Sequence, residues 1–208
     1  IDSNYACTYY PWVKTFDSDN NQYIYLPPTK DVVKNFAYTD NTAYPWFAAA
    51  GWNRGQISGV NPKKVLKLSE QDELYGGRIN FINKFASEGM RIWGDKNLQV
   101  AESQMNRISK RRLLVRIRKL LSIACIGLIF DPNDNTTVKS FKSAVEPILD
   151  DIRNKRGLTD YRIEVDDSQE ARDRLELPAK IYLKLQPNLE YIDISFVITP
   201  SGANFDDV

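Results

Sequence analysis

The sequence predicts an α+β fold in which a mixed sheet packs with two main helices and the chain finishes in a β-hairpin. Two long segments, 104–124 and 136–156, repeat apolar residues at the three- and four-residue spacing of an amphipathic helix. Short runs at 161–165, 181–185 and 192–198 alternate apolar and polar residues, as half-buried strands do. Helical and strand-like segments do not alternate regularly along the chain, which favours α+β over α/β.

The first half of the chain predicts two strand pairs and short helices. Tyrosine-rich runs at 5–12 and 23–26 flank a dense turn cluster at 17–21, so we expect these two runs to pair. A short helix is expected from residue 29 or 30 to Phe36. The remaining expectations are an ordered but irregular aromatic segment at 39–62, a helical turn at 69–75 with Ser69 as its N-cap, and strands at 79–85 and 90–93.

In the second half, the helix at 104–124 is expected to run into a strand at 126–130 that ends before Asp131-Pro132. Pro147 lies inside the second helix and is expected to kink it or to break its bonding locally. Gly157 is predicted at the C′ position just after that helix. We expect two portions, 1–98 and 99–208, with one continuous compact unit as the alternative.

Composition excludes several kinds of chemistry. The 208 residues contain no histidine, which removes histidine-based nucleophile activation, general bases and metal ligands. The two cysteines, Cys7 and Cys125, are far apart and form no metal-binding motif, so a reducing compartment is expected. Lysine plus arginine number 28 and aspartate plus glutamate 27, a balance unlike that of a diffuse polyanion binder. The longest apolar stretch, 120–130, is shorter than the roughly 20 residues that span a bilayer.

The clearest charged feature is a basic segment within the first long helix. At 100° per residue its cations flank the apolar stripe on both sides. Three interpretations stay open: a solvated helix face, a phosphate-binding surface, or a surface that pairs with an acidic protein. Acidic pairs at 150–151, 166–167 and 206–207 could supply the acidic side. The charged-contact candidates are Arg107, Arg111, Arg112, Arg116, Arg118 and Lys119.

Other patterns indicate ordinary structure. The adjacent acidic pairs are poor metal sites, because neighbouring residues point to different sides of a helix or strand. Glycines at 51, 55 and 59 match no phosphate-binding loop and indicate permissive turns. The triplet at 135–137 is interpreted as helix capping. The aromatic residues Trp46, Phe47 and Trp52 are more typical of packing or of an interface than of a sugar or base site.

Four segments, in order, resemble contractile-phage tail sheath proteins. The first has a Pro-Pro start, a short helix, Pro-Trp and a closing Gly-x-x-Arg-Gly, and the second joins Ile-Asn to a strand ending Trp-Gly-x-x-x-Leu. The third joins an Arg-Arg-Leu helix to Phe-x-Pro-Asn-Asp, and the last is a closing strand. They are PPTKDVVKNFAYTDNTAYPWFAAAGWNRG (27–55), INFINKFASEGMRIWGDKNL (79–98), NRISKRRLLVRIRKLLSIACIGLIFDPND (106–134) and ISFVITPSGANF (194–205).

The resemblance implies a structural protein with no catalytic residue and no cofactor. Copies would polymerise around a tail tube, and on a signal from the baseplate the sheath would shorten and drive the tube through a bacterial envelope. The implied partners are other copies, the tail tube protein, and baseplate and tail terminator proteins, with no nucleic acid and no membrane insertion. The implied location is the virion tail, with assembly in the host cytoplasm.

Family members are usually longer, so we expect this chain, which begins at Ile1, to be the C-terminal part of a sheath subunit or a processed chain. One alternative is the sheath of a related bacterial contractile machine, pyocin-like or from a secretion system. Another, from a different class, is a nucleic-acid-binding module that uses the basic segment 107–119.

Two further sets of residues are candidates for contacts in such an assembly. In this family a helix of the C-terminal domain is expected to line the tube, and the outward face of the second long helix lies opposite its apolar stripe. The terminal hairpin has an apolar edge strand, which suggests an edge that pairs with a neighbouring subunit. The tube-contact candidates are Lys139, Ser143, Glu146 and Asp150, and the intersubunit strand candidates are Ile181, Leu183, Leu185, Ile192, Ile194, Phe196 and Ile198.

Overall fold

The structure, a computed structural model that describes residues 1–192 and 194, confirms the α+β class. The strands are β1 (Thr8–Tyr10), β2 (Val13–Asp17), β3 (Gln22–Leu26), β4 (Asn61–Pro62), β5 (Ile79–Phe85), β6 (Gly89–Trp93), β7 (Leu158–Val165) and β8 (Ala179–Leu185). The helices are α1 (Thr29–Thr42), α2 (Gly51–Arg54), α3 (Leu68–Gly76), α4 (Ile108–Cys125), α5 (Asn135–Asn154) and α6 (Gln169–Asp173), with 3₁₀ helices η1 (Gln104–Asn106) and η2 (Ile126–Leu128).

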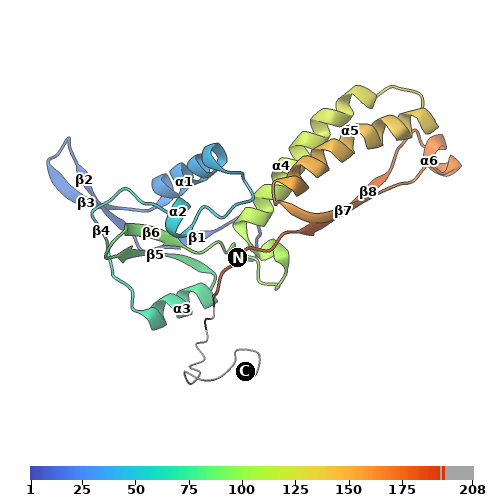
Figure 1. Ribbon diagram of the computed structural model, residues 1–208. Helices are drawn as coiled ribbons and strands as arrows, with labels where there is room; N and C mark the ends of the chain where they lie inside the picture. The colour runs from blue at the N-terminus through green and yellow to red at the C-terminus, as the bar shows by residue number, and fades with distance from the viewer. Residues whose placement is uncertain (193, 195–208) are drawn as a thin grey trace, which may run out of the picture.

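The molecule is elongated and has two lobes (Figure 1). One lobe holds β1 to β6 with α1, α2 and α3. The other holds α5, β7, β8 and α6, and α4 runs from the first lobe into the second. Each lobe has its own cluster of buried apolar residues.

The first lobe is built on the mixed sheet β1-β5-β6. This sheet confirms the strands expected at 79–85 and 90–93, which pair antiparallel with Ile82 opposite Ile92. β1 adds in parallel on the other side of β5, with Thr8 opposite Ile79. Ile82 and Ile92 are fully buried and pack with Val13 and with Val32 of α1, and this cluster is the core of the lobe.

The strand pair expected near the N-terminus forms with a different first strand. β3 lies where the second run was expected, but its partner is β2, with Val13 opposite Leu26. The run at 5–12 supplies β1 to the mixed sheet instead. The turn is where the sequence placed it: the Asp17 carboxylate accepts the backbone N–H of Asp19 at 3.1 Å, and Asn21 has a left-handed φ of 50°. A short turn pairs the residues directly beside it, and 13–17 are closer to it than 5–12.

The helices of the first lobe differ from expectation at their ends. α1 continues to Thr42 rather than ending at Phe36, and the added turns bury Thr39 against the lobe. α3 begins one residue before Ser69, so Ser69 is not its N-cap. The carboxylate of Glu70 accepts the backbone N–H of Lys67 at 2.9 Å and satisfies that end of the helix. The segment 39–62 is ordered, as expected, but contains the end of α1, α2 and β4.

The second lobe consists of two helices packed on a two-stranded sheet. α4 and α5 lie side by side over the antiparallel pair β7–β8 (Figure 1), so the main helices cover this sheet rather than the mixed one. Its core is formed by the apolar stripes of the helices, the inner sides of the strands and one residue from the first lobe, Trp46. The core residues are Trp46, Leu113, Ile117, Val145, Leu149, Ile152, Leu158 and Leu185.

The strand expected at 126–130 is absent: these residues form η2 and a turn. Among the described residues no strand pairs with this run, and Ile126 and Ile129 are exposed. The chain has to reverse here to bring α5 back along α4, and a tight reversal is incompatible with an extended strand. Asp134 then opens α5 by accepting the backbone N–H groups of Thr136 and Thr137 at 2.8 and 2.9 Å.

The sequence misplaced the left-handed residue at the end of α5 by one position. Arg156, not Gly157, has the left-handed φ, 64°. The N–H groups of Arg156 and Gly157 donate to the carbonyls of Arg153 and Ile152 at 3.0 and 2.8 Å, the two bonds of a Schellman motif. Gly157 is required for a different reason, because an added Cβ would lie 2.6 Å from the Ile152 side chain and 3.2 Å from Trp46.

Pro147 lies on the exposed side of α5, which remains one continuous helix. Pro147 has no N–H to donate to the carbonyl of Ser143, and it lies on a side where water can supply a donor instead. The local loss of bonding that the sequence predicts therefore does not interrupt the helix.

The terminal hairpin was predicted between 181–185 and 192–198. In the described chain the partner of β8 is β7, with Leu183 opposite Tyr161 and Ile181 opposite Ile163. Ile192 and Ile194 lie outside any strand. Phe196 and Ile198 are outside the described residues.

Candidate subunit interfaces

A buried polar junction joins the two lobes where the chain after β8 crosses the start of α4. Asp95 follows the mixed sheet, Ser109 and Lys110 lie in the first turn of α4, and Asn188 comes from the segment after β8. Asn188 Nδ2 donates to Asp95 at 3.3 Å and to Ser109 Oγ at 3.0 Å, and Lys110 Nζ donates to Asn188 Oδ1 at 2.7 Å. The Ser109 hydroxyl also donates to Asp95. Four side chains from three parts of the chain therefore fix this crossing.

Burial dominates the electrostatics of the junction. It raises the pKa of Asp95 to about 6, although the hydrogen bonds from Ser109 act in the opposite direction. Burial also lowers the pKa of Lys110, against the attraction of Asp95. Both shifts reflect the cost of keeping charge in this closed site.

Two buried asparagines, Asn80 and Asn97, hold the chain next to this junction by side-chain hydrogen bonds. Asn80 on β5 donates to the carbonyls of Thr8 and Lys96 at 3.2 and 2.7 Å and accepts the N–H of Lys96 at 2.8 Å. Asn97 donates to the carbonyls of Asn4 and Met105 at 3.3 and 2.7 Å. These side chains replace strand hydrogen bonds where the chain leaves the sheet, so the loop 94–98 is held rigidly.

Three of the charged-contact candidates, Arg107 at the N-cap of α4 and two arginines in its first turns, have partners within the chain. Arg107 forms a two-point ion pair with Glu190, at 2.5 and 2.9 Å. Arg111 lies 4.2 Å from the ring centre of Tyr5. Arg112 lies over Phe36 and contacts Asp40 at 2.5 Å. Within the described chain, the acidic partners of Arg107 and Arg112 are Glu190 and Asp40, which no sequence pattern marked.

The other three candidates, Arg116, Arg118 and Lys119, are exposed. They are the part of the basic segment that is available to another molecule. The surface open to phosphate is therefore smaller than the sequence implied.

A groove lies beside α4, between this helix and the segments 4–7 and 36–45. We call it the α4 groove. It encloses about 440 Å³ and continues, past Asp40, Pro45 and Arg116, into a more polar hollow of about 600 Å³ that reaches Lys155. Its wall carries four cations, Arg111, Arg112, Arg116 and Lys119, and one carboxylate, Asp40. Apolar side chains also line it: Phe36, Ile108 and Val115.

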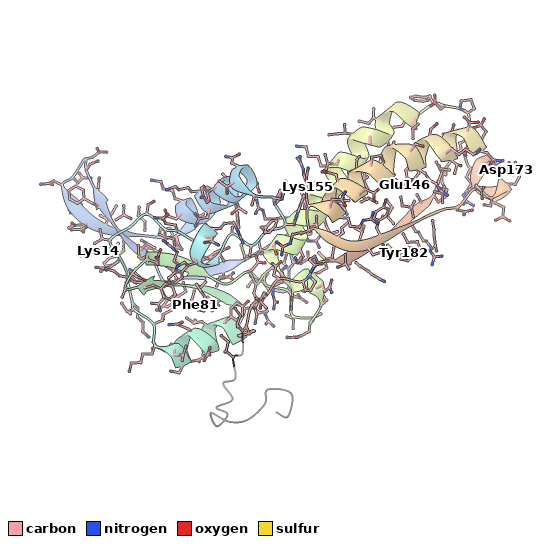
Figure 2. The ribbon with its side chains drawn as sticks, viewed as in Figure 1. Lys14, Phe81, Glu146, Lys155, Asp173 and Tyr182 are labelled. Atoms are coloured by element: carbon pink, nitrogen blue, oxygen red, sulfur yellow. The ribbon has the colours of Figure 1, made fainter. Side chains whose placement is uncertain are left out.

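The tube-contact candidates lie along one side of α5, and Lys139, Ser143 and Glu146 are exposed (Figure 2 labels Glu146). Asp150 is engaged inside the chain: it accepts the Tyr161 hydroxyl at 2.8 Å and pairs with Arg153 at 2.9 Å. The first three are thus free for a partner, whereas Asp150 also ties α5 to β7.

The strand candidates on β8 have side chains that face the core of their own lobe. Ile181, Leu183 and Leu185 pack on the α4–α5 core, while Tyr182 faces the opposite side and is exposed (Figure 2). In the described chain β7 and β8 each have one strand neighbour, so each has a backbone edge with no strand beside it. What β8 offers a second molecule is therefore its backbone edge.

No cluster of three or more potential metal-ligating side chains occurs among the described residues. None of the helices among the described residues is both long enough and apolar enough to cross a membrane. The cysteines Cys7 and Cys125 are both free thiols, and burial raises the pKa of each.

Solved structures with the same fold include sheath proteins of contractile injection systems. The PVC sheath complex in the contracted state matches all of this chain and 58% of that chain, with a TM-score of 0.86 and 24% identity. The helical sheath of the anti-feeding prophage in the contracted state matches 94% of this chain and 56% of that chain, with a TM-score of 0.83 and 21% identity. At these identities the likeness establishes the fold alone.

The sequence relatives of the chain are tail sheath proteins of phages. The chain is 35% identical over its whole length to the tail sheath protein of Vibrio phage KVP40 and 28% identical to that of Enterobacteria phage T4. It is similar over its full length to phage tail sheath proteins, which confirms the resemblance seen in the motifs. It spans about a third of the length of these relatives, 31% and 32%. No protein-family model matches the chain.

Proposed function

We propose that this chain is part of a structural subunit of a contractile tail sheath, which polymerises around a tail tube and shortens to drive the tube through a bacterial envelope. The observation that carries the proposal is similarity to phage tail sheath proteins over the whole chain. The fold supports it, because contracted sheaths superpose on all or nearly all of the chain. In this role the chain is not an enzyme and needs no cofactor.

The proposed partners are other copies, the tail tube protein, and baseplate and tail terminator proteins. The proposed location is the virion tail, after assembly in the host cytoplasm. A bacterial contractile machine remains the second candidate, and one observation favours it: the superposing structures include the PVC system and the anti-feeding prophage. Electron microscopy of the full-length protein tests both, since hollow striated tubes are expected and their absence under assembly conditions would contradict them.

Strand addition is the proposed link between subunits. Support comes from the β7–β8 sheet, which has only two strands in the described chain and so leaves main-chain donors and acceptors along both edges. Residues 192–198 have an apolar side chain at every second position and contain one charge, Asp193, a pattern expected of an added strand. A neighbouring copy would supply this strand, and the inner residues Ile181, Leu183 and Leu185 would support the receiving sheet.

Truncation before Asp193 and the substitution Ile194→Pro test strand addition in the full-length protein. The proline removes one main-chain donor, so both variants should stay folded but fail to form tubes. Ile194→Val is the matched control, because it keeps the donor and the β propensity, and it should assemble normally. If the proline variant forms normal sheath that contracts, the contact that links subunits must lie on the helices instead.

Tube contact is proposed for the exposed side of α5. The supporting observation is that Lys139, Ser143 and Glu146 are exposed on one side of a helix whose opposite side is buried. Exposed ion pairs stabilise by only about 0–1 kcal/mol each, which suits a contact that must release on contraction.

Because Asp150 has partners inside the chain, the sharper test reverses Lys139 and Glu146 together (Lys139→Glu, Glu146→Lys). Sheath assembly on tubes should fall while the circular dichroism and melting of the monomer stay unchanged. Lys30→Glu, on α1 in the other lobe, is a control that should assemble normally. Normal assembly of the double variant would assign the tube contact to another surface, with the exposed cations of α4 as the next candidate.

A further inference from the structure

The α4 groove is lined by more cations than the carboxylates of the described chain neutralise. Four cations and one carboxylate line it, and Asp40 already pairs with Arg112. Among the described residues, Nε of Arg111 and Nη1 of Arg112 have no hydrogen-bond acceptor. The exposed cations Arg116 and Lys119 stand beside apolar lining, so the groove suits a ligand that carries both an apolar group and carboxylates.

The last part of the sequence has this composition. No lysine or arginine follows Lys184, whereas four carboxylates do: Glu190, Asp193, Asp206 and Asp207. Glu190 is already paired with Arg107. Asp206 and Asp207 directly follow Phe205, so an aromatic ring and two carboxylates lie within three consecutive residues.

We propose that the segment 204–207 of the unassembled subunit docks in the α4 groove of its own chain. The ring of Phe205 would lie on Phe36, Ile108 and Val115. Asp206 and Asp207 would meet Arg116 and Lys119 at the rim.

The chain is long enough for this docking. Phe205 follows Ile194 by eleven residues, which can extend over about 36 Å. The segment that carries Asn188 and Glu190 is held by Arg107 and Lys110, on a different side of α4 from Arg116 and Lys119. The tail therefore has to pass around one helix, which is about 10–12 Å across.

Docking would hold the strand candidates of 192–198 near their own subunit until a neighbour replaces that contact. This role rests on strand addition, but the docking itself does not. The test therefore uses unassembled chain and separates the two ideas.

Cys7 lines the α4 groove and serves as a natural reporter. The variant Asn204→Cys, made in a Cys125→Ser background, places a second thiol beside the proposed anchor. In dilute protein under mild oxidation, we expect a disulfide within one chain between Cys7 and the introduced cysteine, seen as a monomer band and identified by peptide mass. A disulfide between two chains, or none, would overturn the proposal.

A charge exchange makes the test specific. Arg116→Glu with Lys119→Glu should slow cross-linking at least tenfold, and so should Asp206→Lys with Asp207→Lys. Combining the four substitutions should restore the rate to within about threefold of the starting variant. The matched control, Lys30→Glu with Lys63→Glu in the first lobe, removes two exposed cations outside the groove and should leave the rate unchanged. Failure of the combined variant to recover, or an equal effect of the control, would overturn the proposal.

Discussion

Arg107 at the start of α4 and Glu190 after β8, 83 positions later, form a two-point ion pair in which Nε and Nη2 donate to the two carboxylate oxygens at 2.5 and 2.9 Å. Their side chains are only 22% and 21% exposed. Tyr75 donates its hydroxyl to the same carboxylate at 2.9 Å, so α3, α4 and the chain after β8 meet at one group. This contact and the Asp95 junction hold the end of the second lobe against the first.

Glu190→Gln should loosen the segment 186–192 from α4. The loss of a partly buried, charge-assisted pair should lower stability by about 1–2 kcal/mol. Hydrogen exchange should show faster exchange in this segment while the α4–α5 core is unchanged. Glu176→Gln, whose pair with Arg174 is exposed, is the control and should change stability by less than about 0.5 kcal/mol. Equal effects of the two substitutions would contradict the structural role of Glu190.

Asp95 should make stability depend on pH in a defined window. Its pKa in the folded chain, about 6, is above the value of about 4 expected when unfolded, because burial disfavours its charge. The folded state therefore binds this proton more tightly, and the contribution of Asp95 to stability is full below pH 4 and is lost as pH rises to about 6.

Urea unfolding of the parent chain and of Asp95→Asn, measured between pH 4 and 7, checks this prediction. The difference between them should change across pH 4–6 and become constant above it. Val145→Ala, a control that removes no titratable group, should give a constant difference throughout. A constant difference for Asp95→Asn would show that its charge is not suppressed by burial.

Trp46 should be the largest single contributor from the first lobe to the core of the second. It is 5% exposed, stacks on Tyr44 and donates its Nε1 to the carbonyl of Lys155 at 3.0 Å. Trp46→Ala should destabilise by about 3–5 kcal/mol, measured by urea unfolding. The control Trp52→Ala, at a site that is 44% exposed, should cost clearly less. Similar losses at both sites would contradict the assigned role of Trp46.

Substitutions at two adjacent residues at the end of α5 should change stability in opposite directions. Arg156→Gly should stabilise by about 0.5–1 kcal/mol, because glycine adopts the left-handed φ without steric cost. Gly157→Ala should destabilise, because its Cβ would crowd Ile152 and Trp46. Thermal melting of the two variants should shift in opposite directions, and shifts of the same sign would contradict the assignment of the cap.

Much of the fold was predictable from local pattern. The helices 108–125 and 135–154 follow from apolar spacing, and β5 and β6 follow from strand-forming runs around a Glu-Gly turn. The sequence predictions were wrong where pairing with a segment distant in the sequence determines whether, and with what, a strand forms. The run at 126–130 is apolar enough for a strand, but no strand of the described residues lies beside it, and the run at 5–12 pairs with β5 rather than with the strand next in sequence.

The sequence by itself showed the resemblance to tail sheath proteins, because that resemblance rests on residue identities in a fixed order, and it located the cations on one helix. Only the tertiary structure decided which cations are free. Asp40 and Glu190 lie 72 and 83 positions from their partners Arg112 and Arg107, so no local spacing could pair them. The buried junction of Asp95, Ser109, Lys110 and Asn188 was equally invisible, since each residue alone is typical of a surface. Long-range folding brings them together and removes the water that would otherwise solvate them.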